Sequence, residues 1–237
     1  MKFNLIFSFN LRIRPQSIKE RVEMCKICTH VTPHEPQIRL GNKDDKSFTF
    51  DAVYNIDSKQ EDIFESSVRF LVDGCLDGYN ATVLAYGQTG SGKTYTMGTS
   101  FDTCLSMQEE GILPRAISYL FEKVEQKFAA IPNSEIIINA QFIELYNEEI
   151  IDLLESLSTG SAAHRQISQF NNNNNNGDLI HEFNSIKTKI EIHEDQFGGI
   201  FINGCSTVNV QSIQEVGRFY CFIIYSYFIV ELLLLHI

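Results

Sequence analysis

The sequence predicts an α/β fold in which helices flank a central mixed sheet. The first observation is a glycine-rich turn from Gly87 to Thr94, which fits the phosphate-binding pattern G-x-x-x-x-G-K-[ST] and follows the apolar run 81–86. The second is that segments with helical and with strand periodicity occur on both sides of this turn. The third is a hydrophobic content of 43% in 237 residues, which is enough for a sizeable core.

The first predicted element is a strand over residues 5–13. Pro15 ends it, because proline cannot donate to a sheet ladder. Residues 1–9 also resemble a short signal peptide, but Arg12 and Arg14 interrupt the apolar stretch and no small-residue cleavage site is visible. A strand is therefore the preferred interpretation of this segment.

Further elements follow in order along the chain. The strand-like segments are 25–40, 47–51, 81–86, 136–146, 150–154, 190–193 and 200–210. Helical spacing of apolar residues predicts helices at 62–72, after Gly92, and at 112–128. Residues 156–187 contain six consecutive asparagines, so this low-complexity insert is predicted to be a disordered loop.

The glycine-rich turn is a candidate triphosphate site. Glycines let successive backbone N–H groups turn inward around phosphate oxygens without a Cβ in the way. Lys93 would reach the β- and γ-phosphates, and the Thr94 hydroxyl would bind Mg²⁺. The alternative is a chance glycine-rich turn, against which the preceding strand pattern argues. The candidate residues are Gly87, Gln88, Thr89, Gly90, Ser91, Gly92, Lys93 and Thr94.

The amino-acid composition indicates which class of binding partner and which cellular compartment fit this protein. The net charge of −11, from 30 acidic and 19 basic residues, argues against nucleic acid as the main partner. Six scattered cysteines are typical of reduced thiols in a cytosolic protein. Cys25 and Cys28, with His30 and His34 nearby, have half the pattern of a zinc site, but no second ligand pair has the expected spacing. Ordinary residues of a small β region are the simpler interpretation.

Several short motifs stand in an order shared with a known family. They are Arg12-Ile13-Arg14-Pro15, Gly78-Tyr79-Asn80, the run from Ala81 to Met97, Gly111-Ile112-Leu113-Pro114-Arg115-Ala116 and Glu144-Leu145-Tyr146-Asn147-Glu148-Glu149-Ile150. Together they resemble a kinesin motor domain over roughly residues 9–216. The segments 28–33 and 192–195 look most like the kinesin-4 class.

The resemblance implies a kinesin-type P-loop NTPase fold and an ATP-driven microtubule motor, with ATP and Mg²⁺ as cofactors and a cytoplasmic, cytoskeletal location. It also implies that Arg14 and Pro15 pack against the adenine, with Arg12 nearby and Tyr95 on the other face of the ring. Without the family, Arg12 and Arg14 would be read as a solvated strand end and Pro15 as a strand terminator. Direction of movement, cargo and oligomeric state depend on other parts of such proteins.

The chain also departs from the family. Neither the switch I pattern Asn-x-x-Ser-Ser-Arg-Ser-His nor the switch II pattern Asp-Leu-Ala-Gly-Ser-Glu occurs in it. Residues 1–217 are therefore interpreted as a C-terminally truncated motor domain that lacks the main microtubule face, with phosphate binding but little or no ATPase activity. An inactive P-loop fragment or adaptor is the alternative function, and a generic P-loop enzyme such as a small-molecule kinase is a more distant one.

The hydrophobic tail 218–237 lies outside the family pattern. Its segment 219–235 carries one charge, at Glu231, and is at the short limit for a membrane-spanning helix. Three interpretations stay open: sequence from a truncated or mis-spliced gene, a hydrophobic membrane anchor, and a buried core helix. The first is preferred.

Overall fold

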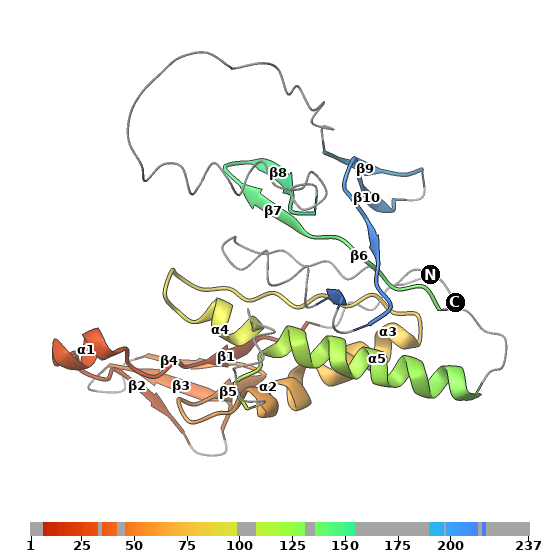
Figure 1. The fold of residues 1–237 in the computed structure, drawn as a ribbon. Helices are drawn as coiled ribbons and strands as arrows, with labels where there is room; N and C mark the ends of the chain where they lie inside the picture. Colours follow the sequence, from red (N-terminus) through yellow and green to blue (C-terminus); the bar gives the residue numbers. More distant parts are fainter. Residues whose placement is uncertain are drawn as a thin grey trace, which may run out of the picture. The chain divides into compact units, whose positions relative to one another are not determined.

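The computed structural model describes residues 7–32, 35–41, 46–98, 108–130, 136–154, 190–196, 198–212 and 215–216. The chain divides into two compact units, Met1–Glu122 and Lys123–Ile237. Strands and helices are both present along the chain, which confirms the predicted α/β class (Figure 1). The described strands form five small sheets rather than one continuous central sheet. The predicted insert 156–187 and the tail 218–237 lie outside the described residues.

The strands of the first unit form two sheets. β1 (Asn10–Arg12) pairs in parallel with β5 (Ala52–Tyr54), so that Arg12 lies opposite Tyr54. β2 (Thr29–Val31), β3 (Gln37–Leu40) and β4 (Lys46–Thr49) form an antiparallel sheet. The short helix α1 (Ile18–Val22) lies between β1 and β2 in the sequence. β1 is thus shorter than the predicted strand 5–13, and it brings Arg12 beside a strand 42 residues further along the chain.

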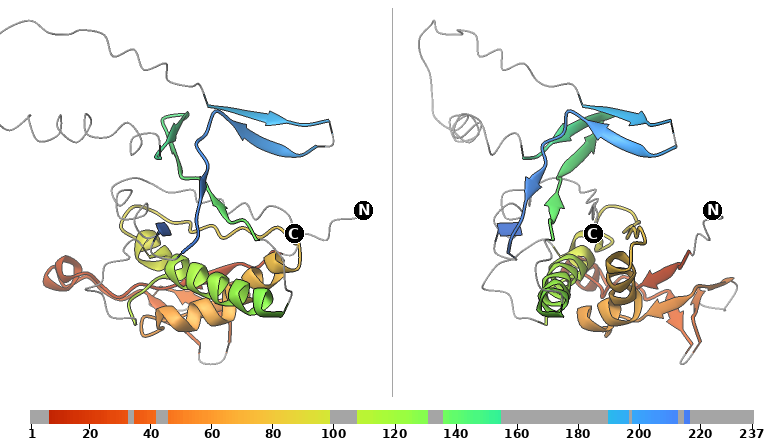
Figure 2. Two further views of the ribbon diagram at one scale, coloured as in Figure 1. Left: turned by 45° about the vertical axis from the view of Figure 1, so that its right-hand side comes forward. Right: turned by 90° about the vertical axis from the view of Figure 1, so that its right-hand side faces the viewer.

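Helices form the core of the first unit. The buried cluster consists of Ile63 and Phe64 of α2 (Gln60–Ser67), Val68 between α2 and α3 (Arg69–Leu76), and Ile112 at the start of α5 (Ile112–Ala130). Figure 2 shows these helices from two further directions. The single helix predicted at 62–72 is wrong in one respect, since Val68, with φ −122°, divides it into α2 and α3. The division places Val68 in the core cluster, where it is 4% exposed.

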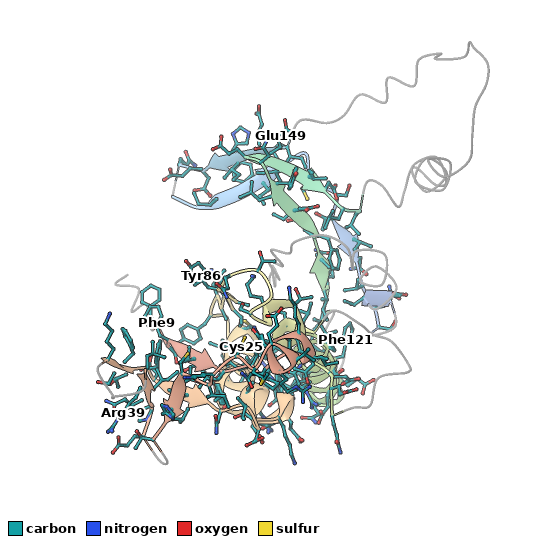
Figure 3. All side chains as sticks on the ribbon, turned by 90° about the vertical axis from the view of Figure 1, so that its left-hand side faces the viewer. Phe9, Cys25, Arg39, Tyr86, Phe121 and Glu149 are labelled. Atoms are coloured by element: carbon teal, nitrogen blue, oxygen red, sulfur yellow. The ribbon has the colours of Figure 1, made fainter. Side chains whose placement is uncertain are left out.

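The strand predicted before the glycine-rich turn does not form. Residues 81–86 have no strand partner among the described residues. Leu84 is 81% exposed and Tyr86 is 95% exposed (Figure 3). An apolar extended segment becomes a strand only when its N–H and C=O groups bond a neighbouring strand, and the apolar pattern alone does not supply that neighbour.

Beyond the end of α5, the described residues of the second unit consist mainly of short paired strands and the segments that join them. β6 (Asn139–Ala140) pairs with β11 (Val208–Asn209), and β9 (Glu191–Glu194) pairs with β10 (Ile200–Asn203). β7 (Ile143–Tyr146) and β8 (Glu149–Asp152) form a hairpin. The predicted strand 136–146 is therefore two short strands in different sheets. The carboxylate of the buried Asp152 accepts from the N–H groups of Leu154 (2.8 Å) and Ser206 (2.7 Å), which ties β8 to the chain after β10.

The β7–β8 turn carries backbone strain at Glu148. Asn147 and Glu148 have φ of 50° and 67°, as a two-residue hairpin turn with a right-handed twist requires. Glycine adopts this conformation without a Cβ penalty, so Glu148→Gly is expected to raise the free energy of unfolding by about 0.5–1 kcal/mol. Urea unfolding would measure it. Glu149→Gly, in strand β8, is the matched control and is expected to be destabilising; a loss of stability in both variants would contradict the assignment of strain to Glu148.

Candidate functional site

The glycine-rich turn folds into a closed loop ahead of α4 (Lys93–Met97). Gly90 and Gly92 have φ of 80° and 97°, a left-handed conformation that residues with a Cβ rarely adopt. A Cβ added to Gly87 would lie 2.5 Å from Ser91 Oγ. The glycines of the pattern are therefore required by the shape of the loop, and they leave the space that a Cβ would fill.

Lys93 lies against this loop. Its Nζ donates to the main-chain oxygens of Gly87 (2.7 Å) and Gln88 (3.0 Å). Thr94, the next residue of α4, is exposed, so its hydroxyl is accessible to a hydrated cation. A cation inside a turn of glycines fits an anionic ligand, and an adjacent hydroxyl fits Mg²⁺. The donor set of the site thus agrees with a magnesium-bound polyphosphate.

Arg12 at the end of β1 is brought to α4. Its Cζ lies 5.1 Å from the centroid of the Tyr95 ring. Its Nη1 donates to Gln60 Oε1 (2.6 Å) and to Thr96 Oγ1 (2.9 Å). Desolvation by burial lowers the pKa of Arg12, and the nearby Tyr95 partly offsets this. Arg12 thus lies over the Tyr95 ring, while the residue Tyr95 stays 55% exposed.

Arg14 lies next to the loop but pairs with another residue. The nearest atom to a Cβ built on Gly92 is Arg14 Cβ, at 3.9 Å. Its guanidinium donates to both carboxylate oxygens of Glu20, at 2.7 and 2.6 Å, and to the Pro15 carbonyl at 3.0 Å. The Arg14 hydrogen bonds, helped by the Ser17 main-chain N–H, lower the pKa of Glu20 to about 2. The structure therefore brings Arg12, Arg14 and Tyr95 to the loop, with the Arg14 charge already paired.

Sequence reasoning missed Gln60, the first residue of α2. It is 1% exposed, and its Nε2 donates to the main-chain oxygen of Tyr95 (2.6 Å) and more weakly to that of Glu109 (3.4 Å). Nothing in the local sequence distinguishes it from a surface glutamine at a helix start. Only its partners, 35 and 49 residues away, identify it as part of the site.

A second missed feature is the contact between Gly98, directly after α4, and Gly111, directly before α5. A Cβ added to Gly111 would lie 2.2 Å from Gly98 N and 2.3 Å from Gly98 Cα. The main chain at the end of α4 therefore touches the main chain at the start of α5. Gly111 stands in one of the motifs noted above, which was the available signal for it.

The zinc and membrane hypotheses gain no support from the described part of the chain. Cys25 and Cys28 are exposed free thiols, and no cluster of three or more metal-ligating side chains occurs among the residues described. His34 lies outside those residues. No helix within the described ranges has the length and apolar character needed to cross a membrane.

Comparison with known proteins gives one consistent match. The family model described as Kinesin motor domain matches residues 12–222. The kinesin-like protein KIF21B of Mus musculus is 46% identical over 211 residues, which cover 87% of this chain and 11% of that protein. The kinesin-like protein KIN-4A of Gossypium hirsutum is 38% identical over 209 residues, covering 87% of this chain and 18% of that protein. This chain therefore spans only a small part of the length of these curated relatives.

A solved structure agrees with these matches. The one described as "Structure of a fast kinesin: Implications for ATPase mechanism and interactions with microtubules" superimposes with a TM-score of 0.65 and is 30% identical. The match covers 88% of this chain and 49% of that chain.

Proposed function

Because this chain belongs to the kinesin motor-domain family, we propose that it is the ATP-binding part of a microtubule motor domain, with residues 87–94 holding the nucleotide phosphates. The observation that carries the proposal is the loop itself, in which Gly90 and Gly92 adopt φ values above zero and Lys93 Nζ lies against the loop carbonyls. The relatives support it, since the fast kinesin structure is described in terms of ATPase mechanism and microtubule interaction.

The proposal gives separate roles to Lys93, to Thr94 and to the main chain of the loop. Lys93 exchanges its two carbonyl partners for phosphate oxygens, which are stronger acceptors because they are charged. The Thr94 hydroxyl binds Mg²⁺, which when bound neutralises phosphate charge. The backbone N–H groups of residues 87–92 contribute further donors, and the glycines keep the approach open.

The adenine is proposed to lie against Tyr95. Tyr95 is 55% exposed although Arg12 lies over its ring, and it follows Lys93 and Thr94 directly in α4. The exposed Pro15 can pack against a flat base, and the aliphatic stem of Arg14 can do so without giving up its Glu20 partner. Stacking of a base on an aromatic ring tolerates any base, so this contact contributes affinity more than selectivity.

A complete motor and a nucleotide-binding fragment differ in their ATP turnover. A complete motor hydrolyses ATP faster on microtubules, whereas a nucleotide-binding fragment or adaptor does not. The second outcome is favoured for this chain by itself, because residues 1–237 contain neither switch pattern. Similarity to KIN-4A supports the assignment to the kinesin-4 class.

Binding of a fluorescent N-methylanthraniloyl derivative of ATP to the full chain tests the proposal. We expect saturable binding that needs Mg²⁺, that inorganic tripolyphosphate competes for, and that EDTA weakens. Absence of binding would contradict the proposal. Phosphate release and co-sedimentation with microtubules then distinguish a motor from an inactive fragment, because microtubule-stimulated turnover would exclude the fragment.

A further inference from the structure

Gln60 connects three segments that are distant in sequence. Its Oε1 accepts from Arg12 at the end of β1, and its Nε2 donates to the main chain of Tyr95 in α4 and of Glu109 before α5. The side chain is 1% exposed, so water does not replace these partners. A buried amide that loses its partners is strongly unfavourable, and each contact is therefore held in place by the others.

The contact with Tyr95 matters because α4 is short. The helix has five residues, and at its two ends Thr96 N–H donates to Gly92 O (2.9 Å) and Gly98 N–H donates to Thr94 O (3.0 Å). A helix of this length has little stability of its own in water. The 2.6 Å hydrogen bond from Gln60 to the Tyr95 carbonyl is thus an external anchor for the main chain that carries the Tyr95 ring.

The contact between Gln60 and Arg12 also orients the Tyr95 ring, in this case through side chains. Gln60 and Thr96 each accept from Arg12 Nη1, which directs the guanidinium toward Tyr95 at 5.1 Å from the ring centroid. A cation over an aromatic ring is attracted by the ring electrons and restricts the ring to one orientation. Gln60 therefore acts on Tyr95 through two routes, one through the main chain and one through Arg12.

We propose that Gln60 is a positioning residue for nucleotide recognition, which holds Arg12 against one side of Tyr95 so that the opposite side of the ring receives the base. Gln60 itself does not touch the ligand. The inference rests on the proposed function, because it requires that a nucleotide binds at residues 87–94. It predicts that Gln60 governs the affinity contributed by the base and has little influence on the affinity contributed by the phosphates.

Two substitutions separate the contacts of Gln60. Gln60→Met keeps the length of the side chain and removes its hydrogen bonds. Gln60→Glu keeps the acceptor for Arg12 and removes the donor to Tyr95. Gln37→Met is the matched control, because Gln37 lies in β3 of the β2–β3–β4 sheet, and Arg12 lies in the β1–β5 sheet. The probes are N-methylanthraniloyl-ATP, which has a base, and inorganic tripolyphosphate, which has none.

We expect Gln60→Met to weaken binding of the ATP analogue about tenfold, the effect of roughly one net hydrogen bond, and to leave tripolyphosphate affinity within about twofold. Gln60→Glu should lie between Gln60→Met and the unmodified chain, and Gln37→Met should match the unmodified chain. Unchanged affinity for the ATP analogue, or equal loss for both probes, would overturn the inference.

The fold and the proposed function are checked in the same experiment. Circular dichroism shows whether Gln60→Met is folded; if it is not, Gln60→Glu decides, and an equal loss for both probes in that variant overturns the inference. If the unmodified chain binds neither probe, the proposed function fails and the inference fails with it. If the unmodified chain binds and both Gln60 variants bind equally well, the inference alone fails.

Discussion

Replacing Lys93 by alanine is expected to abolish measurable ATP binding while leaving the fold intact. Its ammonium is the cation that contacts the loop, through the oxygens of Gly87 and Gln88. A charge-assisted bond to phosphate is worth about 1.5–3 kcal/mol, so losing two such bonds weakens binding by a factor of roughly 100 or more. Lys93 and its partners Gly87 and Gln88 are all partly or fully exposed, so water can reach the carbonyl groups that the lysine leaves.

The test of Lys93→Ala compares binding with folding in the same preparation. Titration with the fluorescent ATP analogue measures affinity, and urea unfolding measures stability. Lys26→Ala is the matched control, because Lys26 is an exposed lysine outside the loop and outside any helix or strand. Unchanged affinity in Lys93→Ala would remove the central claim about residues 87–94. A large loss of stability in it would show that the lysine also holds the fold.

Gly111→Ala is expected to cause the largest loss of stability. The added Cβ would meet Gly98 N at 2.2 Å, Gly98 Cα at 2.3 Å and Met97 C at 2.6 Å. All three are main-chain atoms, so they cannot rotate away as a flexible side chain can. Separating the end of α4 from the start of α5 is expected to lower the free energy of unfolding by about 3 kcal/mol and to weaken ATP binding, because α4 begins at Lys93.

Gly74→Ala is the control for this substitution. Gly74 lies inside α3, and a Cβ built there meets nothing within 4 Å. Alanine is the better helix former, so Gly74→Ala is expected to raise the free energy of unfolding by about 0.5–1 kcal/mol. Urea unfolding of both variants gives the comparison. Similar, small effects at the two positions would show that Gly98 and Gly111 do not approach each other closely in solution.

The shape of the loop agrees with the glycine pattern because the requirements of that pattern are local. Gly90 and Gly92 need φ above zero, and Lys93 follows directly to reach the loop carbonyls. The hydrogen bond that the Glu20 carboxylate accepts from the Ser17 N–H, three residues earlier, is equally local, although it was not among the predictions. When two interacting residues are only a few positions apart, both lie within the same short motif. A single sequence is then enough to identify the pair.

The pairing of segments was the part that sequence patterns did not decide. An apolar run at 81–86 predicted a strand, but a strand needs a neighbour, and the described residues supply none. In the same way, the apolar spacing over 62–72 was compatible with one helix, and the packing of Val68 against Ile63, Phe64 and Ile112 accompanies its division into two. Periodicity reports which face of a segment is apolar, and not what that face contacts.

The sequence by itself determined the class of the protein and the place of its proposed phosphate site, through motifs whose spacing is short and whose geometry is local. The tertiary structure decided what surrounds that site. Arg12 reaches Gln60 across 48 residues and Thr96 across 84. Such contacts follow from the parallel pairing of β1 with β5 and from the packing of α2 against α5. Hydrogen bonds between residues so far apart depend on how the whole chain packs, which no local pattern of residue types contains.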